Sequence, residues 1–193
     1  MGGELAQGPR LVVLDPDEAG LVQRAQAGDR EAFSALIGRH QAAVLAYGLR
    51  ALRDEARARD LAQEVFLTFW RERRRYVHRG RLLPYLLTVA RNRALAQHKR
   101  TQASLRLATA VAEAPPRAPS TPLESAERRQ TRARLEAALA RLPDERAEAV
   151  QLRFVLGLSV AEIAEITQVA EGTVKSRIGR GLQGLREELS HER

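Results

Sequence analysis

The chain has 193 residues, 32 lysines and arginines against 24 acidic residues, a net charge of +8 and no cysteine. The lack of cysteine excludes disulfides, thiolate chemistry and cysteine-ligated zinc. The positive charge favours a polyanionic partner, and nucleic acid is the commonest one.

The first half of the chain is predicted to be a helical domain. Residues 1–16 contain glycines and a proline and show little periodicity, which indicates a flexible leader. Alanine, leucine, arginine and glutamate dominate the chain after this leader, and no alternating β-branched run appears, so we expect an all-α fold. Helices are predicted over residues 17–27, from a cap at Asp29 to about Arg53, from Asp54 to about Arg74, and over residues 82–99 after an arginine-rich loop at 75–81.

The character of the sequence changes at about Thr101. Four prolines lie among alanine, serine and threonine before Leu123, and no apolar period survives there. We therefore predict a flexible proline-rich linker over residues 101–122. Helices are expected again over residues 123–140 and 144–156, the second with Pro143 in its first turn. The predicted architecture is two small helical domains, residues 17–100 and 123–193, joined by this linker.

Residues 157–180 are predicted to form two short helices joined by a tight turn, a helix-turn-helix. Ser159 and Glu162 have the spacing of a capping box at the start of the first helix. The second helix alternates inward apolar positions with short polar or cationic side chains, which suits entry into a DNA major groove. These side chains are Thr173, Lys175, Ser176, Arg177 and Arg180. An ordinary helical hairpin with a solvated basic face remains the alternative for this segment alone.

Residues 60–70, within the helix predicted from Asp54 to about Arg74, have a polar side that includes an exposed leucine. Asp60, Gln63, Glu64 and Leu67 lie on that side, and the apolar residues lie on the other. A polar stripe of this kind can simply be solvated. It can equally be a docking surface for a partner helix with basic residues, and the pattern leaves both interpretations open.

Aromatic residues and arginines interleave over residues 66–85. Aromatic rings stack on unpaired bases at ~1–3 kcal/mol per base while arginines follow the backbone, so this mixture suits single-stranded DNA. Tyr76 and His78, in the loop, are the better stacking candidates, and Arg91-Asn92-Arg93 places an amide between two cations. Three other aromatic residues are predicted to belong to the core: Phe66, Phe69 and Trp70.

The succession of these segments resembles the extracytoplasmic-function sigma factors of bacterial RNA polymerase. The matching segments are DLAQEVFLTFW, a basic loop, LPYLLTVARNRAL, a proline-rich spacer, LPDERAEAVQLRFVLGLS and EGTVKSRI. The resemblance implies that the first domain binds core polymerase and opens the minus-ten promoter element. It implies that the second domain binds the minus-thirty-five element. The implied partners are the beta-prime and beta subunits of core RNA polymerase, promoter DNA and an anti-sigma factor.

The resemblance also assigns roles to residues by position. Docking on the coiled coil of the largest polymerase subunit would involve Asp60, Gln63, Glu64 and Leu67. Contacts to the minus-ten element would come from Tyr76, His78, Arg79, Arg91 and Asn92, with Asn92 reading an extruded base. Contacts to the minus-thirty-five element would come from Thr173, Lys175, Ser176, Arg177, Gly179 and Arg180.

The predicted recognition helix departs from the family pattern in its caps and glycines. Gln168 lies near the turn where the family often has glycine, and Ala170 offers no capping side chain. Three glycines fall inside the helix, at ~1 kcal/mol each relative to alanine. They are Gly179, Gly181 and Gly184. We therefore expect a weak DNA reader that depends on polymerase for its remaining affinity.

The alternative function is a stand-alone helix-turn-helix regulator, which would bind an inverted repeat as a dimer. An enzyme is not expected, because the sequence shows no nucleophile with a neighbouring base and no phosphate loop. The four histidines are scattered with no metal-ligand spacing, so we expect no cofactor and no metal. No secretory start and no run of ~18 apolar residues occurs, so a cytoplasmic protein without membrane insertion is predicted.

Overall fold

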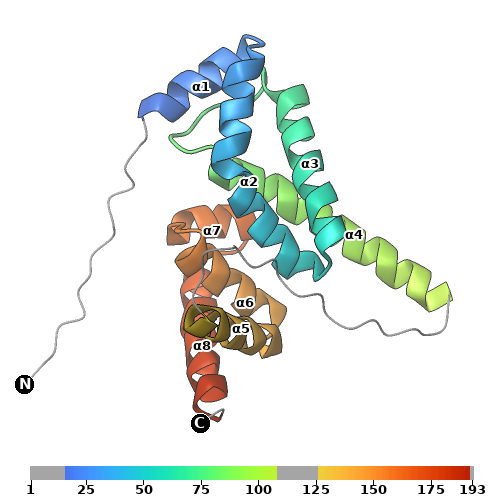
Figure 1. The fold of residues 1–193 in the computed structure, drawn as a ribbon, viewed down its shortest axis with the longest axis vertical. Helices are drawn as coiled ribbons and strands as arrows, with labels where there is room; N and C mark the ends of the chain where they lie inside the picture. Colours follow the sequence, from blue (N-terminus) through green and yellow to red (C-terminus); the bar gives the residue numbers. More distant parts are fainter. Residues whose placement is uncertain (1–15, 108–125, 192–193) are drawn as a thin grey trace, which may run out of the picture.

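The described chain is helical throughout, apart from short connections. A computed structural model describes residues 16–107 and 126–191 (Figure 1). The first unit contains α1 (Pro16–Gln26), α2 (Arg30–Leu52), α3 (Glu55–Glu72) and α4 (Leu83–Leu107). The second unit contains α5 (Ala126–Arg141), α6 (Asp144–Val150) with one wider helical turn, η1 (Gln151–Val155), then α7 (Val160–Thr167) and α8 (Glu171–His191). No strand occurs in these two stretches, so the all-α prediction is confirmed.

Most helices begin and end where local signals predict. The Asp29 side chain caps α2 by accepting the N–H groups of Glu31 and Ala32. Asp54 caps α3 in the same way. The leader and the proline-rich part of the linker lie outside the described residues, and the domain boundaries stay predictions.

Two helix ends and one whole helix differ from the sequence prediction. Helix α4 continues past Lys99 to Leu107, because residues 100–107 contain neither proline nor glycine to stop it. Pro143 is the capping residue before α6, with an extended ψ of 134°, and is not in the first turn. The single helix expected over residues 144–156 is α6 followed by the wider turn η1.

A buried carboxylate connects three elements of the first unit. Glu18 on α1 is 6% exposed, and its Oε2 lies 2.7 Å from His40 Nε2 on α2. Its Oε1 accepts the N–H of Leu82, directly before α4, at 2.7 Å. Burial acts to raise the pKa of Glu18, but the hydrogen bonds from His40 and Leu82 outweigh it and hold the pKa below its ordinary value. An ionised carboxylate therefore fixes the start of α4.

The two helical units share one continuous apolar core. Leu86, Leu87 and Ala90 of α4 belong to the same buried cluster as Ile163 and Ile166 of α7. Helix α4 contacts α2, α3 and α7, which places the second unit directly against the first (Figure 1). The sequence predicts two domains and a linker, but it does not predict this packing, since an apolar stripe does not reveal which surface covers it.

Close packing of α8 on α6 explains two of the three glycines in α8. A Cβ at Gly181 would lie 2.6 Å from Val150 Cγ2 and 3.2 Å from the Arg146 carbonyl oxygen. A Cβ at Gly184 would lie 2.6 Å from Leu142 Cδ2, whereas a Cβ at Gly179 would meet nothing within 4 Å. Gly181 and Gly184 lower the helix propensity of α8, but they let α8 approach its neighbours more closely than alanine would allow.

Alanine at position 181 and alanine at position 179 should therefore have opposite effects on stability. Gly181→Ala is expected to lower the free energy of unfolding by about 1–3 kcal/mol, because the added methyl overpacks a β-branched side chain and a backbone oxygen. Gly179→Ala, with open space around it, is expected to raise the free energy of unfolding by up to about 1 kcal/mol. Urea denaturation of both variants measures this. Equal stabilities would contradict the packing described for Gly181.

The Glu18 cluster should make stability depend on pH. Glu18→Gln is expected to lower the free energy of unfolding at pH 7 by about 1–3 kcal/mol, the usual worth of hydrogen bonds to a charged group. Because the folded pKa is lowered, this difference is present above the ordinary pKa of 4.5 and is lost as pH falls through the lowered value. Denaturation at neutral and acid pH measures it, with the exposed Glu165→Gln as control. A difference unchanged at acid pH would contradict an ionised Glu18.

Candidate polymerase and nucleic-acid interfaces

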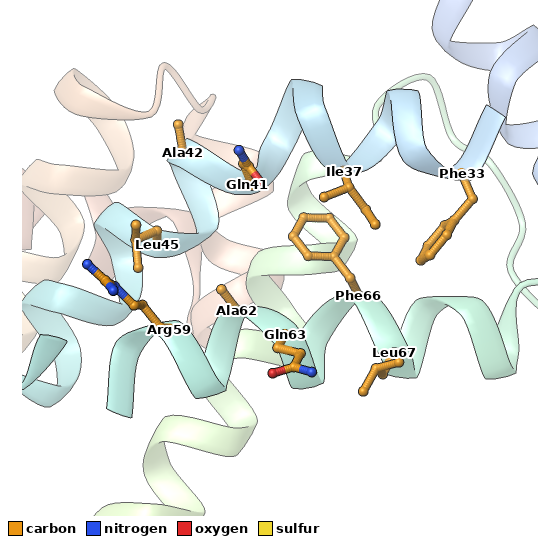
Figure 2. A pocket seen from close by; sticks show the side chains of 10 residues that line it. All are labelled: Phe33, Ile37, Gln41, Ala42, Leu45, Arg59, Ala62, Gln63, Phe66 and Leu67. Carbon is orange, nitrogen blue, oxygen red and sulfur yellow. The ribbon is translucent and has the colours of Figure 1, made fainter. Parts of the chain in front are cut away.

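The four predicted docking residues are all exposed on α3. Gln63 and Leu67 border a groove of about 550 Å³ between α2 and α3 (Figure 2). In Figure 2 the Phe66 ring on α3 points toward Ile37 on α2, and Leu67 lies at the edge of the groove. The remaining lining residues are mostly apolar: Phe33, Ala42, Leu45 and Ala62, with Gln41 and Arg59.

A second, polar groove lies on the other side of the same stretch of α3. Asp60 and Glu64 border it together with four residues of α3 and α4: Arg57, Gln97, Arg100 and Thr101. Glu64 Oε2 also pairs with Arg93 Nη1 at 2.9 Å. The predicted docking residues thus separate an apolar groove from a polar one, which gives this surface both an anchoring pocket and acidic side chains.

Tyr76 is packed into an aromatic cluster. Its ring centroid lies 4.8 Å from that of Tyr85 and 5.6 Å from that of Phe69, and its hydroxyl is 3.3 Å from His78 Nδ1. Burial, with the negative charge of Glu18, raises the pKa of Tyr76 to about 12. In this structure the half-buried Tyr76 ring packs on other aromatic residues, and its predicted stacking on a base stays a prediction.

The other predicted minus-ten residues differ in how accessible they are. Arg79 and Asn92 are exposed, and His78 is half-buried. Arg91 Nε donates to Glu148 Oε1 at 3.1 Å, and Arg93 Nη2 donates to the Thr68 hydroxyl at 2.7 Å. The two cations that flank Asn92 are both half-buried and engaged with protein groups, so Asn92 is the exposed residue of the three.

Three neighbouring aromatic residues were predicted to belong to the core, and two of them do. Phe66 and Phe69 are buried in the first unit. Trp70 is half-buried, with its ring 4.7 Å from the Phe33 ring and beneath the Arg73 guanidinium, 3.9 Å from the ring centroid. Trp70 therefore belongs to the rim of the core.

The first helix of the helix-turn-helix begins at the predicted capping box. Ser159 Oγ accepts the N–H of Glu162 at 3.2 Å, and Glu162 Oε2 accepts the N–H of Ser159 at 2.7 Å. Gln168 ends α7 in the left-handed conformation, with a φ of 59°. A non-glycine residue in that conformation costs roughly 1–2 kcal/mol, as expected from the missing turn glycine.

The exposed face of α8 brings together five of the six residues predicted to meet the minus-thirty-five element. These are Thr173, Lys175, Ser176, Gly179 and Arg180. Arg177 differs, because it is half-buried and its Nη2 pairs with Glu145 Oε2 on α6 at 3.0 Å. In this structure Arg177 stabilises the contact between α6 and α8, whereas the sequence predicted a phosphate contact.

A buried polar cluster between the two units is not predicted by the sequence patterns. Glu148 on α6 is 7% exposed and accepts the Tyr47 hydroxyl of α2 at 2.7 Å as well as Arg91 Nε. Burial and the charge of Glu148 raise the pKa of Tyr47, so the phenol stays protonated and donates. The one available signal is an acid inside the apolar run of residues 147–150, all of which are buried.

Comparison with known proteins identifies the family. The family model "Sigma-70 region 2" matches residues 36–104, and "Sigma-70, region 4" matches residues 132–185. RNA polymerase sigma factor CarQ of Myxococcus xanthus is 33% identical over 170 residues, covering 87% of this chain and 95% of CarQ. The ECF RNA polymerase sigma factor SigK of Mycolicibacterium vanbaalenii is 30% identical over 183 residues, covering 92% of this chain and 91% of SigK. This chain belongs to the extracytoplasmic-function sigma factors. It spans 63% of another relative, BldN of Streptomyces coelicolor, at 32% identity over 86% of its own length.

Two solved structures share the fold of this sigma factor. RpoE of Bartonella quintana, in complex with the anti-sigma factor NepR, superimposes with a TM-score of 0.71 at 23% identity over 83% of this chain and 98% of RpoE. CnrH, in complex with the cytosolic domain of CnrY, gives 0.67 at 21% identity over 91% of this chain and 99% of CnrH.

Family membership settles the class of function. Sigma factors are non-catalytic initiation factors, and this one directs promoter-specific transcription by RNA polymerase. The alternative of a stand-alone regulator is not supported. Within residues 16–107 and 126–191, no helix combines the length and apolarity needed to cross a bilayer.

The exposed face of α8 yields a direct test. Arg180→Ala is expected to weaken promoter binding by the polymerase holoenzyme and to reduce the slope of log affinity against log salt by about 1, since one phosphate contact is lost. Arg186→Ala, also exposed and farther along α8, is the matched control and should change neither. Filter binding over a salt series measures both. An unchanged slope for Arg180→Ala would contradict its assignment.

Proposed function

We propose that the two helical units of this sigma factor divide promoter recognition between them. Residues 17–100 dock on core RNA polymerase and contact the minus-ten element, and residues 123–193 bind the minus-thirty-five duplex. The observation that carries the proposal is the exposed face of α8, which holds five predicted DNA contacts in the segment matching Sigma-70 region 4. Helix α7, capped by Ser159 and Glu162, packs against α8.

The proposed polymerase contact is the exposed surface of α3. Asp60 and Glu64 supply negative charge toward a basic partner helix, and Leu67, 41% exposed, supplies an apolar side chain at the mouth of the groove. Gln63, beside Leu67, completes the contact. The proposed partner of this surface is the coiled coil of the beta-prime subunit, and the beta subunit is the other proposed polymerase partner.

The proposed minus-ten contact centres on Asn92. Its exposed amide reads an extruded base, and Arg79 and Arg91 bind the flanking phosphates. His78 borders the base pocket. Tyr76 forms the floor of that pocket from within the aromatic cluster, because its ring already packs against Tyr85 and Phe69.

We further propose that an anti-sigma factor restrains this protein and that it acts in the cytoplasm, where RNA polymerase works. Support for the first point comes from RpoE of Bartonella quintana and CnrH, which were solved with the anti-sigma factor NepR and with CnrY. Support for the second comes from membership of the sigma-factor family.

Core binding tests the proposed division of labour. The triple variant Asp60→Ala/Gln63→Ala/Leu67→Ala should raise the Kd for core polymerase at least tenfold, or ~1.4 kcal/mol, because it removes a charge and the apolar anchor. Fluorescence anisotropy of labelled protein measures the Kd, and run-off transcription reports initiation. Gln23→Ala, exposed on α1, is the control. Tight core binding by the triple variant would reject the α3 surface, and wild-type protein that initiated from no promoter would reject the function itself.

A further inference from the structure

Helix α1 holds the entry of the basic loop, residues 75–81, which connects α3 to α4 (Figure 1). Gln26, half-buried at the end of α1, donates two hydrogen bonds through its Nε2. One goes to the Arg73 carbonyl oxygen at 2.9 Å and the other to the Tyr76 carbonyl oxygen at 2.7 Å. Arg73 caps the end of α3, where carbonyl groups lack partners within the helix. A single side-chain amide therefore ties both the end of α3 and the start of the loop to α1.

The same helix holds the exit of the loop. Glu18 Oε1 accepts the N–H of Leu82, the residue that follows the loop, at 2.7 Å. Glu18 is 6% exposed, and its Oε2 lies 2.7 Å from His40 Nε2, so the carboxylate cannot turn away without leaving buried groups unpaired. Glu18 and Gln26 are eight residues apart, or about 12 Å along the helix axis. Helix α1 thus fixes the backbone on both sides of the loop.

A third contact crosses the loop itself. The Tyr76 hydroxyl donates to the Arg81 carbonyl oxygen at 3.4 Å and lies 3.3 Å from His78 Nδ1. Gly80, with a φ of 91°, supplies the left-handed backbone with which the chain turns back. Arg81 also pairs with Glu162 of the second unit at 3.1 Å. The contacts made by α1, in contrast, lie wholly within the first unit and do not depend on where the second unit packs.

The side chains of the loop face solvent although its ends are fixed. Val77 is 69% exposed, and Arg79, a predicted minus-ten contact, is also exposed. A loop whose backbone is ordered beforehand loses less conformational freedom when it binds, so more of its contact free energy appears as affinity. The arrangement is therefore that of a binding loop held ready by a neighbouring helix.

We propose that Gln26 and Glu18 are positioning residues for promoter opening, which hold the basic loop in the geometry that receives the extruded minus-ten base. The proposal rests on the minus-ten contact proposed above and adds two residues that themselves touch no DNA. Extruding a base costs free energy that contacts to the base must offset, and a mobile loop would offset less of it. Loss of the α1 contacts should therefore weaken capture of the minus-ten strand and leave core binding unchanged.

Gln26 offers the cleaner substitution of the two, because Glu18 also contributes to the pairing of His40. Gln26→Met removes both donated hydrogen bonds and keeps a side chain of similar length and helix propensity. Gln26→Ala removes the same hydrogen bonds without adding an apolar side chain, so it is the second variant. The matched control is Gln23→Met, the same change at an exposed position one turn earlier on α1.

The first measurement reports the loop in the free protein. Val77→Cys introduces the only thiol into a cysteine-free chain, and a nitroxide attached there reports loop motion by electron paramagnetic resonance. Gln26→Met and Gln26→Ala in this background should shift the spectrum toward that of a more mobile label. Gln23→Met should leave the spectrum unchanged, and circular dichroism verifies that each protein is folded.

The second measurement reports capture of the promoter by the holoenzyme, without the label. Fluorescence anisotropy gives the Kd for a single-stranded oligonucleotide with the non-template minus-ten sequence of a promoter that the holoenzyme transcribes. Both Gln26 variants should raise this Kd about fivefold, the effect of losing roughly one hydrogen bond of ordinary strength. Permanganate footprinting should show a smaller opened fraction of the duplex promoter. The Kd for core polymerase should stay that of the parent, and Gln23→Met should match the parent throughout.

Four results would overturn the positioning role. They are unchanged label motion in both Gln26 variants, a more mobile loop without weaker oligonucleotide binding, an equal effect of Gln23→Met, and an equal loss of core binding, which would indicate a general defect. The parent holoenzyme separates these results from failure of the proposed function. If the parent captures the minus-ten oligonucleotide, only the role of α1 is lost; if it does not, the minus-ten assignment is rejected together with that role.

Discussion

Helix α4 joins the two units, because it packs against helices of both and still presents side chains predicted to face DNA. The Glu18 carboxylate fixes its start through Leu82, and its apolar residues pack on α2, α3 and α7. What remains of its surface carries Arg91, Asn92 and Arg93. A change in the packing on one side of this helix therefore affects the side chains on its other sides.

The contact between the units combines apolar area with a small polar network. Apolar packing alone would tolerate sliding of α7 along α4, whereas Glu148 must meet both Tyr47 and Arg91 at hydrogen-bonding distance. Buried ion pairs gain little net free energy because both charges lose water, but removing one partner is costly. The network therefore contributes more to the register of the two units than to overall stability.

Much of the fold could be predicted from the sequence, since its signals are local. Asp29 and the Ser159–Glu162 box cap helices as expected, and the exposed positions of α3 and α8 follow helical periodicity. The polar network could not be predicted, because periodicity does not show that Glu148 points at another unit. The neighbours of Tyr76 and Arg177 could not be predicted for the same reason: each is polar and near a DNA-facing position, but residues of other elements contact its side chain.

In the free protein the two units pack together around the buried Glu148. A double-mutant cycle on Tyr47→Phe and Glu148→Gln, followed by urea denaturation, tests it most directly, because these residues lie on different units and interact only when the units pack. The structure predicts a coupling free energy of about 0.5–3 kcal/mol, the range for residues in direct contact. Additivity of the two single substitutions within about 0.3 kcal/mol, the behaviour of independent sites, would contradict it.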